Sequence, residues 1–350
     1  MRLPEFDYRL PPERVAQEPG ARRDASRLMI LERGGQGVRE TVFASIGDHL
    51  ASGDLLVLND TRVVPARLRS RKPTGGLVDL LLVARDPADP EGRTWRCLAS
   101  TSRGLKPGSR LGIAPGFEAE FLGETEEGRV RVRLHDAGGD VEGALRRHGS
   151  VPLPPYIRRD DRDAREAIDR ERYQTVYARR DGAIAAPTAG LHFTEELLGG
   201  LRARGIGTST LTLHVGPGTF QPVRAQNIEE HRLEPEAFRL PPETAGAIAA
   251  CRARGGRVVA VGTTVVRVLE GRARDDGSVE PGEGSCGTYI TPGHRFRAVD
   301  ALLTNFHLPR TSLLILVAAF AGRERILAAY EEAIARGFRF YSYGDAMLIL

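Results

Sequence analysis

The sequence predicts an α/β main domain with a small antiparallel β-barrel domain inserted into it. Strand and helix patterns alternate after residue 183, which is typical of a mostly parallel sheet covered by helices. Residues 66–134 instead show short β-rich runs separated by Gly, Pro and acidic turns. An apolar strand pattern, Leu55–Leu58, precedes this stretch. We therefore expect residues 1–65 and 150–350 to form one discontinuous domain, with residues 66–149 as the inserted barrel.

The β-rich stretch predicts a small antiparallel barrel or sandwich without a helix of useful length. Its candidate strands are Leu77–Val83, Thr94–Ala99, Arg110–Ile113, Glu118–Phe121 and Arg129–Leu134. The stretch carries more basic than acidic residues, so it can account for the excess positive charge of the chain.

The main domain repeats a strand, a polar loop and a helix. A charge-dense segment of mixed sign, Arg158–Arg180, comes first, and an exposed helix or loop is its default interpretation. Arg257–Val261 then leads through a Gly-Thr-Thr turn into a helix that ends near Glu270. Ala301–Thr304 leads in the same way to a helix from about Ser312. A last helix is expected over Arg323–Arg336, closed by a glycine.

The composition limits the classes of protein to consider. The chain of 350 residues has a net charge of +4, which permits a polyanionic partner without requiring one. Lysine occurs only at Lys72 and Lys106, and every other basic residue except histidine is arginine. This bias is explained by genome composition, or by the ability of arginine to bind RNA phosphates with its planar fork.

The cysteines and the hydropathy indicate a cytoplasmic protein. The three cysteines are far apart and lack metal-ligand spacing, as expected for buried thiols in a reducing compartment. The N-terminal sequence has no apolar segment of a secretion signal. The longest apolar run, Leu313–Ala321, is too short for a membrane span and predicts a buried helix. We expect no membrane association.

The residues that could take part in catalysis or binding gather in loops that follow predicted strands. Two segments, Pro187–Thr194 and Thr212–Phe220, hold two histidines among hydroxyl and glycine positions. Their composition fits neither an amphipathic helix nor an alternating strand. Further polar loops of this kind are Asn59–Arg62, Gly262–Thr264, Asn305–His307 and Tyr343–Asp345. If these strands share a sheet, the loops meet at one edge and line an active site.

Several familiar sites are excluded, and the remaining residues keep two interpretations each. The chain has no nucleophile elbow, Walker loop, dinucleotide fingerprint or metal-ligand cluster, so we expect no metal. His192, His214 and His307 are acid–base candidates, although a single histidine at a strand end is more often structural. Thr263 and Thr264 start a helix, where they either hold a carboxylate or ribose or simply cap the helix. Aromatic rings beside these loops either stack on a purine or pack in the core: Phe193, Phe220 and Phe306.

Long motifs spread over the chain resemble one family, the S-adenosylmethionine:tRNA ribosyltransferase-isomerases of bacterial queuosine biosynthesis. The matching strings are Phe6–Tyr8, Val15–Gln17, Arg23–Leu28, Leu56–Arg67, Thr74–Gly76, Val151–Ile157, Asp169–Tyr177, Pro187–Thr194, Thr212–Phe220, Ala260–Thr264, Val299–Pro309 and Tyr341–Met347. The resemblance implies an α/β fold with an inserted barrel. It also implies that S-adenosylmethionine serves as a co-substrate, with no other cofactor.

The resemblance implies a reaction in which S-adenosylmethionine donates its ribose. The acceptor is 7-aminomethyl-7-deazaguanine at the wobble position of a tRNA with a GUN anticodon. The products are epoxyqueuosine in the tRNA, adenine and methionine. We expect the protein to act as a monomer.

Site residues are carried over at the matching positions, with roles that are hypotheses. We assign proton transfer to His192 and His214, with Asp60 or Asp345 orienting one of them. Substrate binding is assigned to Arg62, Thr188, Gly190, Gly216, Thr219, Thr263, Thr264, Asn305 and His307. Phosphate contacts with tRNA are assigned to a basic strand of the insert, namely Arg67, Arg69, Arg71 and Lys72, for which a solvated edge strand is the alternative.

Two positions depart from the family pattern. The family usually has a second histidine shortly after Glu230-His231, and this chain lacks it. We infer that the second histidine is dispensable and that His231 is the better candidate of the two. The loop Ser285–Ile290 lacks the usual aromatic residues, which weakens any binding role for it.

Two other functions compete with the one that the resemblance implies. An RNA methyltransferase needs a glycine-rich first turn and a following acidic strand end, which we do not find. A non-catalytic RNA-binding protein leaves the histidine-containing loops unexplained.

Overall fold

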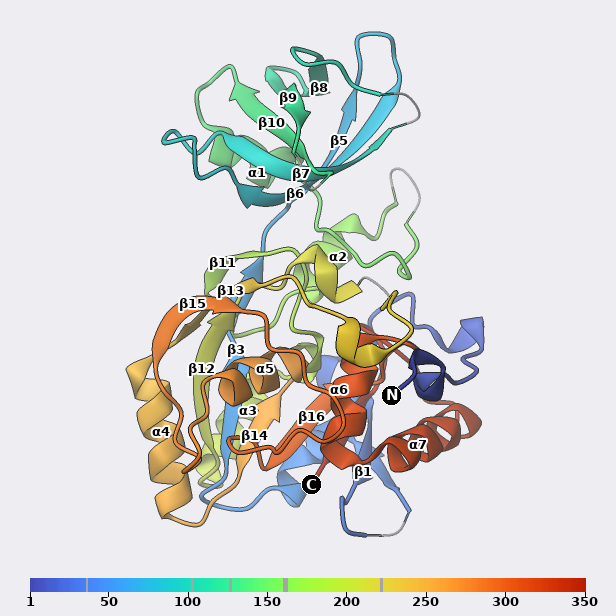
Figure 1. The fold of residues 1–350 in the computed structure, drawn as a ribbon, viewed down its shortest axis with the longest axis vertical. Helices are drawn as coiled ribbons and strands as arrows, with labels where there is room; N and C mark the ends of the chain where they lie inside the picture. The colour runs from blue at the N-terminus through green and yellow to red at the C-terminus, as the bar shows by residue number, and fades with distance from the viewer. Residues whose placement is uncertain (36, 102–103, 126–127, 160–162, 221–222) are drawn as a thin grey trace. The chain divides into compact units, whose positions relative to one another are not determined.

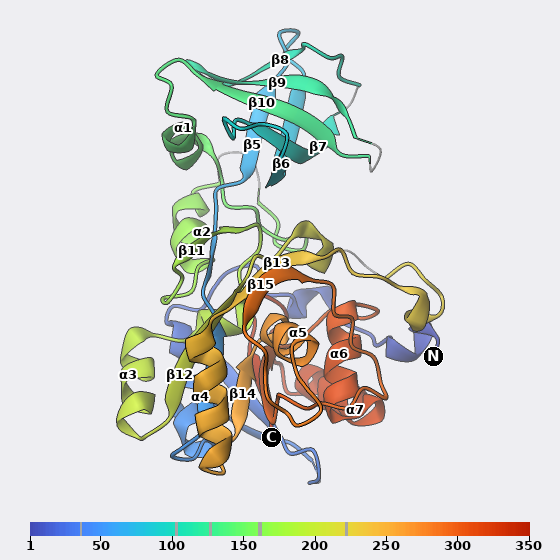
Figure 2. The same cartoon turned by 60° about the vertical axis from the view of Figure 1, so that its left-hand side comes forward.

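The computed structural model describes the chain except residues 36, 102–103, 126–127, 160–162 and 221–222, and except the side chains of residues 219 and 220. The chain divides into two compact units, shown in Figures 1 and 2. The first unit comprises Met1–Arg62, Pro154–Asp160 and Arg172–Leu350, and the second comprises Val63–Leu153 and Asp161–Glu171. The predicted fold class is confirmed, because one unit contains a sheet covered by helices and the other a closed antiparallel barrel.

The first unit is built on a nine-stranded mixed sheet. Its strand order is β15 (Gly282–Cys286), β13 (Glu236–Leu240), β12 (Gly207–Leu213), β3 (Leu55–Asn59), β14 (Val258–Val261), β16 (Ala301–Asn305), β17 (Ala346–Ile349), β1 (Arg27–Leu31) and β2 (Arg39–Val42). The central strands β12, β3, β14 and β16 are parallel, as expected from the strand–helix repeat. The flanking pairs β13–β15 and β1–β2 are antiparallel, and β17 runs antiparallel to β16.

Helices cover both faces of this sheet because its apolar side chains alternate between them. On one face Val57, Ala260 and Leu302 pack with four helices. These are α4 (Pro242–Ala253), α5 (Thr263–Gly271), α6 (Ser312–Ala321) and α7 (Arg323–Ala335). On the other face Leu56 and Val259 pack with α3 (Glu195–Ala203) and the 3-10 helix η4 (Phe43–His49). The apolar run from Leu313 is thus a buried helix, and no helix in the described part of the chain could span a membrane.

Shorter elements complete the first unit. A small two-stranded sheet pairs β4 (Thr61–Val63) with β11 (Arg180–Ala183). The remaining 3-10 helices are η1 (Leu3–Phe6), η2 (Pro12–Arg14), η3 (Arg23–Ala25), η5 (Thr188–His192), η6 (Pro217–Phe220) and η7 (Ile228–Glu230). The segment Pro187–Thr194, which shows no clear period, thus forms a 3-10 turn followed by the Thr194 cap of α3.

The second unit is a closed barrel whose strands follow the order β10, β7, β6, β5, β8 and β9. Their bounds are β5 (Arg67–Arg71), β6 (Leu77–Arg85), β7 (Thr94–Thr101), β8 (Arg110–Ala114), β9 (Phe117–Glu124) and β10 (Val130–Asp136). Alternate residues such as Leu68, Leu80, Phe121 and Val132 fill its interior. The helix α1 (Val141–His148) packs on this core and starts at Asp140, whose carboxylate accepts the Gly143 N–H at 2.8 Å. The second unit also contains most of α2 (Glu166–Arg172).

Candidate active site

The parallel strands bring the predicted loops to one edge of the sheet. Strands β3, β12, β14 and β16 end at this edge with Asn59, Leu213, Val261 and Asn305. Strand β17 runs antiparallel to β16 and pairs Ala346 with Asn305, so the preceding turn, Tyr343–Asp345, lies there too. The edge at the carboxyl ends of parallel strands is the usual ligand-binding edge of an α/β sheet. The prediction that these loops meet is confirmed by the strand register.

A pocket opens at this edge and encloses about 700 Å³, including its mouth. Five of the predicted substrate-binding residues line it: Thr188, Thr263, Thr264, Asn305 and His307. Its apolar surface comes from Ala185, Ala186, Ala189, Val215, Phe306, Leu308 and Leu313. Few polar groups among apolar walls are the usual means of fixing the orientation of a bound molecule.

Two tyrosines form an aromatic wall of the pocket that the sequence analysis did not single out. The rings of Tyr156 and Tyr341 are stacked, with centroids 4.4 Å apart and planes inclined by 20°. The Tyr156 hydroxyl lies 2.7 Å from the Ser342 hydroxyl, and burial raises the pKa of both tyrosines, so both phenols are neutral donors. Tyr341 has a φ of 73°, a left-handed conformation that bulky side chains rarely adopt. Both tyrosines lie in stretches of sequence that match the family motifs, so the resemblance could have identified them as candidate site residues.

Asn305 lines the pocket and has a side-chain acceptor without a partner among the described residues. Its side-chain nitrogen donates to the carbonyl oxygens of Tyr341 at 3.1 Å and Asp345 at 3.4 Å. Its side-chain oxygen is buried and has no hydrogen-bond partner among the described residues. An orphaned acceptor in a pocket wall is available to a donor on a ligand, such as a ribose hydroxyl or an exocyclic amine.

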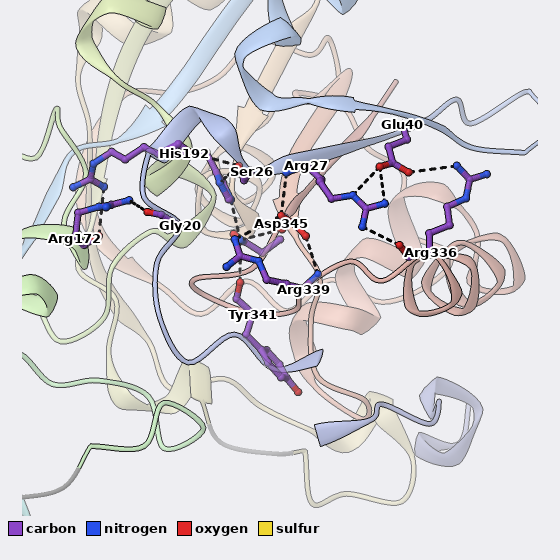
Figure 3. A network of polar contacts seen from close by, with 12 residues as sticks. Gly20, Ser26, Arg27, Glu40, Arg172, His192, Arg336, Arg339, Tyr341 and Asp345 are labelled. Carbon is purple, nitrogen blue, oxygen red and sulfur yellow. Dashed lines mark hydrogen bonds and ion pairs between the residues drawn. The ribbon is translucent and has the colours of Figure 1, made fainter. Parts of the chain in front are cut away.

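His192 lies behind Asn305 as a neutral ring. Its Nε2 is 3.2 Å from the Asn305 side-chain nitrogen, and its Nδ1 is 2.7 Å from the Ser26 hydroxyl (Figure 3). An amide nitrogen donates and does not accept, so in this contact Nε2 is the acceptor and Nδ1 carries the proton. Burial, together with the nearby cations Arg339 and Arg23, lowers the pKa of His192 to about 3. The geometry thus favours positioning of Asn305 by His192, and its assignment to proton transfer stays a prediction.

His307 also lies in the pocket as a neutral ring. Its Nε2 is 2.8 Å from the Thr304 hydroxyl. Its backbone carbonyl accepts from the Tyr8 hydroxyl, and its backbone N–H donates to the Tyr330 hydroxyl at 3.2 Å. Burial lowers the pKa of His307 to about 3. A ring with this pKa does not carry a proton at neutral pH, so His307 is suited to binding rather than to acid catalysis.

His214 is the most accessible of the three histidines. It is half-buried beside the pocket, next to the pocket residue Val215, and its Nδ1 is 2.8 Å from the Thr61 hydroxyl. Burial lowers the pKa of His214, while the carboxylates of Asp60 and Asp181 favour its protonated form. Its Nε2 makes no hydrogen bond with any residue the structure describes. His214 can therefore accept a proton and still be stabilised by Asp60 afterwards.

The other assigned residues lie away from the pocket lining. The Asp60 carboxylate accepts from the Thr212 hydroxyl at 2.6 Å, and the Asp345 carboxylate accepts from the backbone of Arg27 and Arg339. Arg62 donates to the Ala178 carbonyl at 2.7 Å. The backbone N–H of Gly216 donates to Glu236 at 2.7 Å, and a Cβ on Gly190 would meet the Tyr177 hydroxyl at 1.9 Å. Gly190 thus lies where a side chain has no room, the assignment of both glycines to substrate binding stays a prediction, and the side chain of Thr219 lies outside the described residues.

Comparisons with known proteins bear on what this pocket does. The family model described as queuosine biosynthesis protein matches residues 3–349. The chain belongs to this family of enzymes. S-adenosylmethionine:tRNA ribosyltransferase-isomerase of Geobacter sulfurreducens is 52% identical over 349 residues, with 100% of both chains covered. The protein of the same name from an Anaeromyxobacter species is 54% identical, covering 100% of this chain and 99% of its own. A crystal structure of S-adenosylmethionine tRNA ribosyltransferase from Thermotoga maritima is 38% identical, with a TM-score of 0.55, covering 99% and 100% of the two chains.

In this member of the queuosine biosynthesis family, the predicted basic strand is β5 of the barrel. The side chains of Arg67, Arg69 and Arg71 alternate with buried Leu68 and Ser70, so they share the outer face of β5. Arg67 forms an ion pair with Asp79 on β6, in which its Nε and Nη2 atoms contact the carboxylate. Arg71 and Lys72 donate to the carbonyls of Gly75 and Gly104. Within the described chain, no group of three or more His, Cys, Asp or Glu residues could hold a metal ion.

Proposed function

We propose that this enzyme transfers and isomerises the ribosyl group of S-adenosylmethionine onto 7-aminomethyl-7-deazaguanine at the wobble position of tRNA. The products are epoxyqueuosine in a tRNA with a GUN anticodon, free adenine and methionine. The observation that carries the proposal is the pocket with the orphaned Asn305 oxygen and a row of threonine hydroxyls, in a chain whose relatives are named for this transfer.

The pocket offers suitable surroundings for the adenosyl part of the donor. The stacked pair Tyr156–Tyr341 and the apolar residues opposite can contact a flat purine. Thr263 and Thr264 stand at the first turn of α5, where N–H groups and hydroxyls suit a ribose or a carboxylate. Asn59 fixes this turn, because its side-chain nitrogen donates to the Leu213 carbonyl and to the Thr264 hydroxyl.

The chemistry requires proton transfer at two stages. The neutral acceptor amine attacks C5′ of the donor, the C5′–S bond breaks, and its electron pair restores the neutral thioether of methionine. The resulting secondary ammonium loses a proton to a base. A base then acts on the adenosyl fragment, adenine departs with a proton supplied by an acid, and a bond between C1′ and C5′ closes the five ribose carbons into the carbocycle that carries the epoxide.

We propose that His214 is the base of the first stage. It is the half-buried histidine with a free ring nitrogen, and its lowered pKa keeps it deprotonated at neutral pH. Asp60 stabilises the imidazolium that forms, which corresponds to the orienting role assigned to this carboxylate. His192 acts through Asn305 and is a positioning residue.

Incubation of the enzyme with S-adenosylmethionine and a tRNA carrying the aminomethyl base tests the proposal. We expect release of adenine together with a tRNA mass gain that equals a ribose-derived ring. A tRNA lacking the GUN anticodon serves as the matched substrate control. A methyl-sized gain, with label transferred from the methyl group, would identify an RNA methyltransferase instead. Binding of tRNA without any product would leave an RNA-binding protein.

A further inference from the structure

A second pocket on the first unit has four arginines in its lining. Its walls include Arg22, Arg23, Arg172 and Arg339, together with Ser26, His192, Tyr343 and Gly344. No role was assigned to these arginines on the basis of the sequence or of the substrate pocket. They come from three distant parts of the chain, so the folded structure and not a basic tract assembles them. Figure 3 shows two of them, Arg172 and Arg339, near His192.

The positive charge of this second pocket is only partly neutralised. Arg172 donates to the backbone carbonyls of Gly20 at 2.8 Å and Ala21 at 3.3 Å, and no carboxylate among the described residues pairs with it. Its Nε is buried and makes no hydrogen bond within the described structure. Arg339 lies 3.9 Å from Asp345, a carboxylate that already accepts two backbone N–H groups. Arg22 pairs with Asp24 but remains largely exposed, so its outer edge is accessible.

Carbonyl contacts fix these guanidinium groups before any ligand arrives. Arg23 donates to the carbonyls of Leu191 and Arg172, and Arg172 to those of Gly20 and Ala21. A neutral carbonyl orients a guanidinium without cancelling its charge. The field extends to His192, whose pKa is lowered by Arg339 and Arg23 in addition to burial. A preorganised group of guanidinium forks is the arrangement that binds a phosphate in bidentate geometry.

The second pocket adjoins the substrate pocket. Ser342 lines both of them. His192 lines the arginine pocket, and its Nε2 contacts the side chain of Asn305, which lines the substrate pocket. The ring of His192 thus lies between the two pockets. In a nucleotide, a ribose lies in the same way between the base and the backbone phosphate.

We propose that the arginine pocket binds a backbone phosphate of the tRNA next to the modified nucleotide. The inference rests on the proposed function, since it takes the base of that nucleotide to enter the substrate pocket. Arg172, Arg339 and the outer edge of Arg22 supply the phosphate contacts. The other oxyanion available to the reaction is the carboxylate of S-adenosylmethionine. We favour the phosphate because guanidinium groups from three separate segments surround one site, more than a single carboxylate requires.

Binding measurements on Arg339→Gln and Arg172→Gln test this site. Wild type and variants are titrated with an anticodon stem-loop at several salt concentrations, and separately with S-adenosylmethionine. Loss of one phosphate contact should weaken RNA binding several-fold and reduce the slope of log K against log salt by about 0.7, the value for single strands. The affinity for S-adenosylmethionine should stay unchanged. Arg204→Gln, which removes an equal charge from an exposed pair with Asp48, should bind RNA as the wild type does.

A second arm locates the phosphate and removes folding as an explanation. Stem-loops with a neutral methylphosphonate at single positions near the wobble nucleotide should weaken binding to the wild type but not to Arg339→Gln. Arg339→Lys, which keeps the charge, should recover part of the affinity, and thermal melting should show that each variant is folded. Unchanged RNA affinity and salt slope would overturn the proposal, and so would a selective loss of S-adenosylmethionine binding. A wild type that binds RNA with this pattern but releases no adenine would refute the proposed reaction and leave the phosphate site intact.

Discussion

The three histidines of the site share a residue type but differ in their surroundings. His192 and His307 are buried and hold neutral rings, whereas His214 is half-buried and keeps one ring nitrogen available. Their location after predicted strands could be inferred from the sequence, because parallel strands end at one edge. Their protonation could not, because it depends on burial and on partners such as Ser26, Thr304 and Thr61 that lie far away in the chain or on the far side of a turn.

Replacement of His214 tests the assignment of the base. His214→Gln keeps a polar group beside Thr61 but cannot take up a proton, so single-turnover adenine release should slow by about 10²–10⁴-fold. The affinity for S-adenosylmethionine should change little. The wild-type rate should fall as the pH drops through the lowered pKa of His214, and this acid limb should vanish in the variant. His49→Gln, at the end of η4 and remote from the strand-end loops, is the control that should retain the wild-type rate. Equal rates for the wild type and His214→Gln would refute the assignment.

Stability should depend on pH through the two buried histidines. The folded-state pKa of His192 and His307 is about 3, below the ordinary value of 6.5, so the unfolded chain binds their protons first. Their contribution to stability is complete above about pH 6.5 and is lost as the pH falls toward the folded pKa. Each ring should lower the free energy of unfolding by about 1.4 kcal/mol for each pH unit below about pH 6.

Chemical denaturation of the wild type and His192→Gln between neutral and mildly acidic pH measures this effect. The variant should show a shallower loss of unfolding free energy on acidification, whatever its stability at neutral pH. Parallel curves would mean that His192 is protonated in the folded enzyme.

At the scale of elements, a buried ion pair holds the loop that follows β12. Glu236 on β13 accepts the Gly216 N–H and pairs with Arg267 on α5 at 2.5 Å. Arg267 also donates to the carbonyls of Thr288 and Cys286, so one cluster links β13, α5, β15 and the loop after His214. The sequence predicted the loop, but this support was missed, since Glu236 and Arg267 show no common motif.

Glu236→Gln should destabilise the enzyme by about 3–5 kcal/mol, because it leaves the Arg267 charge buried without its partner. Glu283→Gln is a matched control on the neighbouring strand. It breaks the exposed pair with Arg239, and should cost less than about 1 kcal/mol. Urea unfolding monitored by circular dichroism gives both values. A cost for Glu236→Gln as small as that of the control would show that the pair does not support the loop.

At the scale of the whole molecule, the sequence predicted two kinds of architecture because their patterns differ. The barrel strands were detectable through turns rich in Gly and acidic residues, and α5, α6 and α7 through strand–loop–helix repeats. The parallel pairing of β17 with β1 on the flank of the main sheet was not predicted, because most of the chain separates the two strands. The domain limits expected from the sequence, 66–149 for the insert, stay a proposal. Limited proteolysis of the folded enzyme should give cuts near both limits before it degrades either unit.

The basic face of β5 gives a prediction for the barrel. Arg69→Glu and Arg71→Glu together should weaken tRNA binding and flatten its dependence on salt, if this strand contacts phosphates. Arg110→Glu, on the neighbouring strand β8 and paired with Glu118 in the wild type, is the control for charge on the barrel. Filter binding across a salt series measures both. Identical salt slopes for the wild type and the double variant would leave β5 as a solvated strand without a role in tRNA binding.

The order of the strands along the chain has a consequence for synthesis on the ribosome. Strand β3 is made early, but its neighbours β12 and β14 begin only at Gly207 and Val258. The six barrel strands, by contrast, are complete by Asp136 and pair with one another in a closed barrel. The barrel can therefore fold while the main sheet still lacks its central partners, because contacts close in sequence form sooner than distant ones. During translation the buried residues of β3 stay exposed until more than half of the chain has emerged, which makes this strand the point where the nascent protein most needs protection from aggregation.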